Sequence, residues 1–418
     1  MKALSHHRST CRLCGSPAVE MVVPLAPIPV ATPNIGIAAN GLDSLAMAAT
    51  LVPLDLWLCR DCGHVQLLDI IDPEVHYNNF SYRTAISLGL GEHFKQMADS
   101  VGTRVNLQPG DLVVEVGSND GTLLEPFQHA GATVLGIDPA RETARLATER
   151  GIETLATFFT EELGHQIRAR RGPAKVVVCT NTYANLDDID GPTRGIRALM
   201  DETSLFVFET QHGADVIDRF LIDTIYHEHL SYFLVGPLVR FFRAHDMELV
   251  EVEHLPTKGG SFRGYVRLGS GTGEPSGSVA AFMAAEQAAG LHNPATYWPM
   301  SDRLTKARAD LVEVIAHYRA TGRPIAGYGA SVGTVTLISQ LNLAQSLDFI
   351  IDDKPLTEAI IGPDYRIPVV SPQALTERNP ACVIILAWRY AEPIIARNSD
   401  WRAKGGRFIV PLPTLVEL

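Results

Sequence analysis

The chain has 418 residues, 46% hydrophobic and 20% charged, which predicts two or three globular domains. Its 35 Lys and Arg residues against 47 Asp and Glu give a net charge of -12. This balance disfavours nucleic acid as a partner, because phosphate backbones bind basic surfaces. No apolar run approaches the ~20 residues that cross a bilayer, and the first residues lack the apolar core of a signal peptide. We therefore expect a cytoplasmic protein with no membrane partner.

Four of the six cysteines form two Cys-x-x-Cys-Gly pairs within residues 1–72, where helical periodicity is weak. Each pair can wrap two thiolates around one tetrahedral ion, and the following glycine permits the tight turn that this requires. Two unrelated pairs, one of them redox-active, are the alternative. Because four thiolates fill the coordination sphere, we expect a structural zinc ion (Zn²⁺) rather than a catalytic one. The predicted ligands are Cys11, Cys14, Cys59 and Cys62.

Apolar strands alternate with helical patterns through residues 73–270. Buried parallel strands are expected at 111–117, 133–138, 175–181 and 204–210, with two further strands at the sheet edge at 247–255 and 261–268. A helix is expected over 139–151, since a proline stands near its start and a glycine at its end. This βαβα order predicts a doubly wound sheet.

The loop after the first of these strands resembles the glycine-rich loop of dinucleotide-binding proteins, but Glu115 stands where the first glycine should be. A carboxylate there repels a pyrophosphate. It suits S-adenosylmethionine, which carries a sulfonium and an ammonium group and no phosphate. Asp138 ends the next strand, at the spacing expected of an acid that binds ribose hydroxyls, and Phe159 could help to flank adenine. The residues expected to bind the cofactor are Glu115, Gly117, Asn119, Gly121, Asp138, Phe158 and Asn181.

The segment Tyr226-His227-Glu228-His229 lies beyond the strand at 204–210, at the carboxyl side of the sheet, where α/β proteins bind ligands. Methylating a carbon needs a carbanion, which an adjacent carbonyl stabilises as an enolate. A histidine is a natural base for that step, a neighbouring carboxylate can fix its tautomer, and tyrosine hydroxyls can hydrogen-bond the enolate oxygen. A buried polar turn with no catalytic role is the alternative interpretation.

A Gly/Ser-rich stretch at 269–278 marks a boundary, residues 279–322 are expected to be helical, and a second βαβ rhythm begins at residue 323. Its glycine loop, 327–333, follows a strand and opens a helix. Taken alone, this loop predicts either an NAD site or a site for a phosphate at the helix N-terminus.

The fold class is therefore α/β: a small zinc-binding module and two Rossmann-like doubly wound domains. The first of these is expected to be the core of a class I methyltransferase, and the second is expected to be similar to a nucleotide-binding domain. The expected boundaries are 1–72, 73–270 and 271–418. Three domains could enclose an active site within a monomer.

The segment IYHEHLSYF (225–233), the two Cys-x-x-Cys-Gly pairs and GGSFRGYV (259–266) together resemble the C-methyltransferases of deoxysugar biosynthesis, and the resemblance spans nearly the whole chain. It implies methylation of a carbon next to the ketone of a nucleotide-linked, TDP-like keto-deoxysugar, as in antibiotic and other secondary-metabolite pathways. It also implies that His229 is the base, with Tyr226 and Glu228 beside the sugar. From the aromatic stretch 77–83 it implies Tyr82, with Tyr77 second; Phe80 stands where relatives often have tyrosine.

The resemblance further implies that the C-terminal domain cradles the nucleotide diphosphate of the substrate. Relatives read Gly-Tyr-Gly-Ala-Pro-Ala-Lys-Gly in the glycine loop, whereas this chain has Ser331-Val332 and no lysine before Gly333. Another cation must compensate, for which Lys354 is one candidate, or the carrier differs. The residues expected to bind the substrate are Tyr77, Lys258, Arg263, Gly329, Ala330, Ser331 and Asp352.

Three other functions stay open at this point. An NAD-dependent oxidoreductase would use the second glycine loop, with the first sheet as a sensor. A zinc-dependent adaptor protein would leave both glycine loops without a purpose. Methylation of oxygen or nitrogen would use the same cofactor loop as methylation of carbon.

Overall fold

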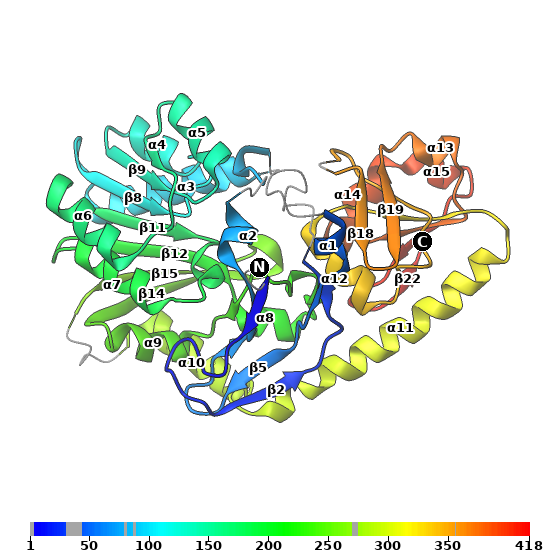
Figure 1. Cartoon of the computed structure of the whole chain (residues 1–418), viewed down its shortest axis with the longest axis horizontal. Coiled ribbons are helices and arrows are strands. Elements are labelled where there is room, and N and C mark those ends of the chain that lie inside the picture. The colour runs from blue at the N-terminus through cyan, green and yellow to red at the C-terminus, as the bar shows by residue number, and fades with distance from the viewer. Residues whose placement is uncertain (1–3, 31–43, 79–81, 87–88, 270–274, 356) are drawn as a thin grey trace.

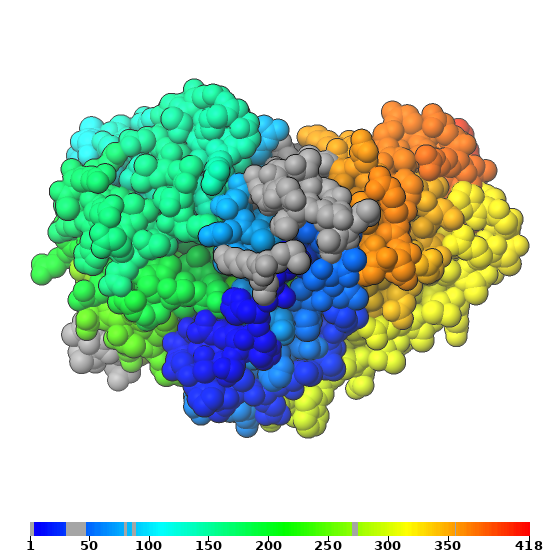
Figure 2. Space-filling model, in the orientation of Figure 1, coloured from blue at the N-terminus to red at the C-terminus, as the bar shows by residue number. Residues whose placement is uncertain are grey.

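The computed structural model describes residues 4–30, 44–78, 82–86, 89–269, 275–355 and 357–418. Two α/β domains lie side by side, and the N-terminal module fills the space between them along one face (Figure 1, Figure 2). The predicted fold class is confirmed. Among the described residues, no helix combines the length and the apolar character needed to span a bilayer.

The N-terminal module contains a four-stranded sheet with the order β13-β6-β5-β2. Its strands are β2 (Val19–Val23), β5 (Leu56–Cys59), β6 (Val65–Gln66) and β13 (Ser231–Tyr232). Around it lie β1 (Ser5–His7), β3 (Ile28–Pro29), β4 (Leu51–Val52), β7 (Asp69–Ile71), α1 (Ser44–Ala49) and α2 (Pro73–Tyr77). Strand β13 begins two residues after His229, so the chain segment that carries the predicted base completes the sheet of the module.

The second domain holds a seven-stranded sheet with the order β10-β9-β8-β11-β12-β15-β14. The strands are β8 (Leu112–Val116), β9 (Thr133–Ile137), β10 (Thr154–Leu155), β11 (Val176–Thr180), β12 (Leu205–Gln211), β14 (Met247–Leu255) and β15 (Ser261–Leu268). The first five in the order pair in parallel, and β15 pairs antiparallel with both β12 and β14. The predicted strands are confirmed, including the last two at the sheet edge.

Helices cover both faces of this sheet, because successive strand residues point to opposite sides. Val113 packs with α3 (Leu90–Val105), α4 (Leu124–His129) and α5 (Arg141–Glu149). Val114 packs with α6 (Glu161–Arg171), α7 (Asp190–Leu199) and α9 (Val235–Arg243). The shorter helices are η1 (Thr84–Ile86), η2 (Tyr183–Asn185), α8 (Gly213–Asp218), η3 (Ile222–Thr224) and η4 (Thr257–Gly259).

Helix α10 (Gly277–Ala288), which the sequence analysis assigned to the third domain, packs against the second domain instead. The Glu286 carboxylate accepts the N–H groups of Val235 and Gly236 at 2.6 and 3.0 Å, at the start of α9. After η5 (Pro294–Thr296), the long helix α11 (Trp298–Arg319) carries the chain across to the third domain (Figure 1).

The third domain also holds a seven-stranded sheet, with the order β18-β19-β17-β16-β20-β21-β22. Its strands are β16 (Ile325–Tyr328), β17 (Phe349–Ile351), β18 (Ala359–Gly362), β19 (Tyr365–Val370), β20 (Cys382–Ile385), β21 (Phe408–Val410) and β22 (Val416–Glu417). Its helices are α12 (Val332–Gln340), α13 (Ala374–Glu377), η6 (Trp388–Tyr390), α14 (Ala391–Arg397) and α15 (Ser399–Ala403). One apolar cluster joins Leu58 of the module, Phe220 of the second domain and Leu337 of the third, so packing fixes how the three parts sit.

Candidate active site

A cavity of about 2260 Å³ lies where the three parts of the chain meet. Its wall combines the loop after β8, three residues of the segment 226–229 (Tyr226, Glu228 and His229) and the residues after β20. The predicted site residues on this wall are Tyr77, Tyr82, Glu115, Gly117, Asn119, Asp138, Phe158, Asn181, Tyr226, Glu228, His229, Lys258 and Ser331. Residues from all three parts therefore enclose one site. Phe80 lies outside the described residues.

The loop after β8 has the geometry of a small-molecule cradle. Gly117 has φ of 75°, and a Cβ on it would lie 2.1 Å from the Thr182 hydroxyl oxygen, so only glycine fits there. Glu115 is 3% exposed, and its Oε2 has no hydrogen-bond partner among the described residues. Burial, and secondly the carboxylates of Asp138 and Asp120, raise the pKa of Glu115 well above its ordinary value. A buried carboxylate without a partner fits a cationic ligand such as S-adenosylmethionine and opposes a pyrophosphate.

Asn119 holds a second segment over this loop. Its Oδ1 accepts the Thr84 N–H at 2.9 Å, and its Nδ2 donates to the Tyr82 carbonyl at 3.0 Å. Its own N–H donates to Asp138 Oδ2 at 2.9 Å. Gly121 is not among the described wall residues; a Cβ there would lie 3.0 Å from Ile152, so this glycine serves close packing behind the loop.

His229 is buried in the turn that follows η3, on the cavity wall. Its Nδ1 lies 2.9 Å from the Thr224 carbonyl, which can only accept, so Nδ1 carries the proton. Nε2 is then unprotonated and accepts from the Tyr226 hydroxyl at 3.1 Å. The expectation that a carboxylate fixes this tautomer is wrong, because the backbone carbonyl makes the contact. The neutral imidazole keeps a basic nitrogen at Nε2.

Helix α2 brings two residues of the N-terminal part against Glu228. His76 Nε2 lies 3.4 Å from Glu228 Oε1, and both side chains are buried. Burial, and secondly the Glu228 carboxylate, raise the pKa of Tyr77 well above its ordinary value, so Tyr77 keeps its proton. Tyr77 and Glu228 both lie on the cavity wall.

A reaction that uses His229 as its base should lack the fall in rate near pH 6.5 that an ordinary histidine gives. Burial, with a smaller effect of Lys258, lowers the pKa of His229 to about 4. The base form therefore stays populated from about pH 8 to about pH 6, and kcat should be flat there in initial-rate measurements. An unfolded chain would take up a proton at this histidine below about pH 6.5, whereas the folded chain takes it up only near the lowered pKa of about 4, so stability should fall as the pH drops from about 6.5 to about 4. A kcat that falls twofold near about pH 6.5 would contradict the assignment.

The four cysteines of the two pairs converge as predicted. The Sγ atoms of Cys11 and Cys62 lie 3.6 Å apart, as do those of Cys14 and Cys59. All four lie within 4.8 Å of one another. Tetrahedral zinc with Zn–S bonds of ~2.3 Å requires S–S distances of ~3.8 Å, so the residues fit this ion.

Removing the zinc is expected to unfold the N-terminal module, since structural zinc contributes ~10–16 kcal/mol in zinc-finger peptides. Cys59→Ser should lower the zinc content well below one ion per chain and lower the melting temperature. Cys179→Ala, a change at a buried cysteine of β11, is the matched control and should keep its zinc. Atomic absorption and thermal melts measure both quantities. Unchanged zinc content in Cys59→Ser would rule out the four-thiolate site.

Three residues of the third domain that were predicted to bind the substrate, Gly329, Ala330 and Asp352, are not among the described wall residues. The Ala330 N–H donates to Asp352 Oδ2 at 2.8 Å, and a Cβ on Gly329 would lie 2.6 Å from the Ala387 Cβ. Internal contacts therefore occupy the loop groups that a phosphate would use. Of this loop, Ser331 lies on the wall together with Val332 and Gly333.

Arg263 is also not among the described wall residues, because it lies in β15 and pairs with Glu209. Its NH2 lies 2.9 Å from Glu209 Oε2, and the other oxygen of that carboxylate lies 2.8 Å from Nε2 of His93. The buried pair joins β12 and β15 to helix α3. Lys258, by contrast, lies on the wall, and burial lowers the pKa of its ammonium group to about 8.

The residues that follow β20 were not predicted from the sequence to belong to the site. Trp388, Arg389 and Tyr390 form η6 and lie on the cavity wall. Arg389 NH2 lies 2.9 Å from Asp223 Oδ2, and its NH1 donates to the Lys258 carbonyl at 2.6 Å. Their position directly after a parallel strand was the available signal, since ligands bind at that edge of α/β sheets. Arg389 thus brings to the wall a cation that the glycine loop lacks.

Comparisons with known proteins agree with this arrangement. A C-methyltransferase C-terminal domain model matches residues 256–413, a methyltransferase domain model matches 91–252, and a zinc binding domain model matches 11–77. The C-methyltransferase NovU of Streptomyces niveus is 34% identical over 404 residues, which cover 96% of this chain and 95% of NovU.

Two further proteins match a part of this chain. A ubiquinone biosynthesis O-methyltransferase of Burkholderia thailandensis is 25% identical over 35% of this chain and 68% of its own length. The crystal structure of magnesium protoporphyrin IX methyltransferase (ChlM) from Synechocystis PCC 6803 with bound SAM matches 43% of this chain and 80% of that chain, at 15% identity and a TM-score of 0.32. The match to NovU extends along almost the whole of both chains, and the four-cysteine site and the cavity agree with it. The chain therefore belongs to the C-methyltransferase family and is an S-adenosylmethionine-dependent methyltransferase with a zinc-binding module.

Proposed function

We propose that the protein methylates the carbon next to the ketone of a nucleotide-linked, TDP-like keto-deoxysugar, in the biosynthesis of deoxysugars for secondary metabolites. One observation carries the proposal: a neutral histidine with an unprotonated Nε2 shares a cavity wall with the Glu115 loop. A base beside the cofactor loop is what methylation of carbon needs, whereas an oxygen or nitrogen nucleophile already carries a lone pair.

The proposed roles follow from the contacts of each side chain. His229 Nε2 accepts the proton from the carbon next to the ketone, and the C–H electron pair moves into the enolate. The Tyr226 hydroxyl, 3.1 Å from Nε2, can turn from the imidazole to the enolate oxygen. Burial, and secondly the Glu228 carboxylate, raise the pKa of Tyr226 well above its ordinary value, so it remains a donor. S-adenosylmethionine, when bound, supplies the methyl group.

The size and the lining of the cavity support a substrate larger than a free sugar. Its volume of about 2260 Å³ exceeds the ~300–1,000 Å³ of ordinary small-molecule pockets, as expected of a site for two large ligands. Trp388 and Tyr390 offer aromatic faces, and Lys258 offers positive charge for a diphosphate, while Arg389 pairs with Asp223 and fixes η6 beside it. We infer that the nucleotide lies against η6 rather than in the glycine loop, where Asp352 already occupies the Ala330 N–H.

A screen of nucleotide sugars with labelled S-adenosylmethionine tests the proposal. TDP-linked 4-keto-6-deoxyhexoses should gain one labelled methyl group in mass spectra. The matched TDP-hexoses with a hydroxyl in place of the ketone should gain none, because their carbon cannot form an enolate. Methylation of the hydroxyl sugars, or of neither group in a screen that includes UDP and GDP carriers, would overturn the proposal.

A further inference from the structure

The two zinc-binding pairs share the sequence Cys-Arg-x-Cys-Gly, yet their arginines have opposite surroundings. Arg12, between Cys11 and Cys14, is 4% exposed. Arg60, at the same place between Cys59 and Cys62, has a side chain that is 45% exposed and contacts Glu20 at 3.5 Å. A turn around zinc needs no arginine at this place, and burying a guanidinium is costly unless specific partners compensate. Arg12 therefore has a role that Arg60 lacks.

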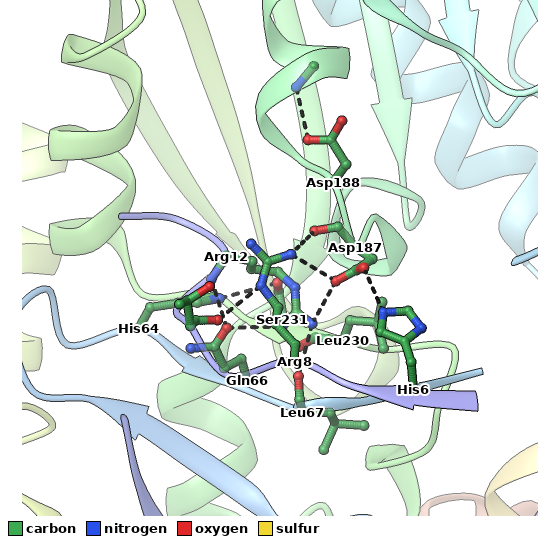
Figure 3. Close-up of polar contacts among 12 residues, drawn as sticks. His6, Arg8, Arg12, His64, Gln66, Leu67, Asp187, Asp188, Leu230 and Ser231 are labelled. Carbon is green, nitrogen blue, oxygen red and sulfur yellow. Dashed lines mark hydrogen bonds and ion pairs between the residues drawn. The ribbon is translucent and has the colours of Figure 1, made fainter. Parts of the chain in front are cut away.

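The partners of Arg12 come from the module and from the second domain (Figure 3). NH1 donates to the Leu230 carbonyl at 2.7 Å, and NH2 donates to the Leu67 carbonyl at 2.9 Å. The Gln66 Oε1 accepts both the Arg12 backbone N–H and NH1, at 3.0 and 3.2 Å. The Leu67 N–H also donates to Leu230 at 2.9 Å, so the module makes two hydrogen bonds to that one carbonyl.

Leu230 is the residue directly after His229, and the chain then enters β13. There Ser231 pairs with Gln66 of β6, which lies beside β5 and its zinc ligand Cys59. His64 Nε2 and Ser231 Oγ lie 3.2 Å apart and add a side-chain contact (Figure 3). His229 is thus fixed at two places. The Thr224 carbonyl holds its side chain, and groups of the zinc module hold the backbone of the next residue, Leu230.

The same guanidinium also reaches the cavity wall at Asp187. Arg12 NH2 lies 3.5 Å from Asp187 Oδ1, and Arg8 NH1 lies 3.0 Å from the same oxygen. His6 Nε2 lies 3.4 Å from Oδ2 (Figure 3). Three basic side chains of the N-terminal segment therefore hold one acidic wall residue.

We propose that Arg12 is a positioning residue for the methyl-transfer reaction: it links the zinc site to the backbone behind His229 and keeps the imidazole in place on the cavity wall. This inference depends on the proposed role of His229 as the base. It gives the zinc module a part in catalysis, with the metal at a distance from the reacting atoms.

Arg12→Met and Arg12→Lys are the test variants, and Arg60→Met is the matched control. Arg12→Met should lower kcat by about 10–100-fold, since small misplacement of a catalytic group costs this much. Arg12→Lys should recover part of the loss, because an ammonium group can still donate to the Leu230 carbonyl. Zinc content and the affinity for S-adenosylhomocysteine should be unchanged in both, because the hydrogen bonds and ion pairs of this side chain, among the described residues, go to Gln66, Leu67, Leu230 and Asp187 and not to the thiolates or to the loop after β8.

Two readouts separate positioning from a merely structural role. The first is exchange of the substrate proton with deuterated solvent, using a TDP-linked 4-keto-6-deoxyhexose and S-adenosylhomocysteine, which reports the base without methyl transfer. The second is amide hydrogen exchange of residues 224–232 in the protein alone, which should quicken in the Arg12 variants and not in Arg60→Met. If Arg12→Met does not fold, Arg12→Lys supplies both readouts.

Rates and amide exchange equal to those of Arg60→Met would overturn the inference, as would a joint loss of zinc and cofactor affinity. His229→Ala distinguishes this failure from failure of the proposed function. If His229→Ala is inactive while the Arg12 variants behave as wild type, only the inference fails. If His229→Ala keeps full activity, the proposed base is wrong.

Discussion

Replacing His229 with alanine is expected to lower the rate of methyl transfer by about 10²–10⁴-fold, the usual contribution of a positioned base. The reason is that Nε2 of His229 is the unprotonated nitrogen of a neutral ring, whose other nitrogen is fixed by the Thr224 carbonyl. Binding of S-adenosylhomocysteine should survive, because the His229 side chain hydrogen-bonds Tyr226 and Thr224, and among the described residues it has no hydrogen bond to the loop after β8. Single-turnover kinetics and calorimetry measure the two properties separately.

His227→Gln is the matched control for this variant. His227 lies two residues away and is buried, but its Nε2 hydrogen-bonds the Pro53 carbonyl at 2.9 Å, and it is not among the described wall residues. Glutamine keeps a donor for that carbonyl, so activity should stay near that of the wild type. Equal activity in His229→Ala and His227→Gln would remove His229 from the mechanism.

Glu115→Gln is expected to weaken binding of S-adenosylmethionine by about 10–100-fold, because a hydrogen bond to a charged group contributes ~1.5–3 kcal/mol. The pKa of Glu115 is raised well above its ordinary value by burial and by Asp138 and Asp120. A bound cation favours the ionised form and lowers that pKa, so binding should release a proton. The affinity of the wild type should therefore increase with pH until Glu115 ionises in the free protein.

Glu125→Gln is the control for this second variant, since the Glu125 side chain on α4 is half-buried and contacts Arg150 at 2.9 Å. Titration calorimetry in two buffers of different ionisation enthalpy gives both the affinity and the proton release. Unchanged affinity in Glu115→Gln, with no pH dependence in the wild type, would contradict a role for this carboxylate in choosing the cofactor.

The strands and the zinc ligands could be predicted because the signals are local. Runs such as 176–179 are apolar on both faces, as is typical of buried parallel strands. The spacing of the paired cysteines alone indicates a metal site. Glu115 and Asp138 could be found in the same way, since each has a fixed place relative to the end of its own strand.

The features that could not be predicted depend on contacts between residues far apart in the sequence. Strand β13 has two residues, and its partner β6 lies more than 160 positions earlier, so no local pattern marks it. Arg12 and Arg60 occupy identical motifs, and only the approach of Leu230 separates a buried arginine from an exposed one. From the sequence, Arg263 was predicted to bind the substrate, but in the structure it forms an ion pair with Glu209 on the neighbouring strand.

The role of the glycine loop of the third domain could not be predicted from the sequence either. A Cβ on Gly333 would lie 2.3 Å from the Asp223 carbonyl oxygen, so this glycine permits close packing of α12 on η3. Glycines that serve packing between domains and glycines that serve a phosphate have the same sequence pattern. Only the structure distinguishes the two, and the contacts of Ala330 and Gly333 weaken the NAD hypothesis.

The central claim is that a base removes a proton from carbon and the resulting enolate takes the methyl group. Its most direct test supplies ¹³C-methyl S-adenosylmethionine and a TDP-linked 4-keto-6-deoxyhexose, and locates the label in the product by carbon–proton correlation NMR. The account predicts a methyl group bonded to the carbon next to the ketone, with the proton of that carbon lost. A label on oxygen, in the chemical-shift range of a methyl ether, would contradict it.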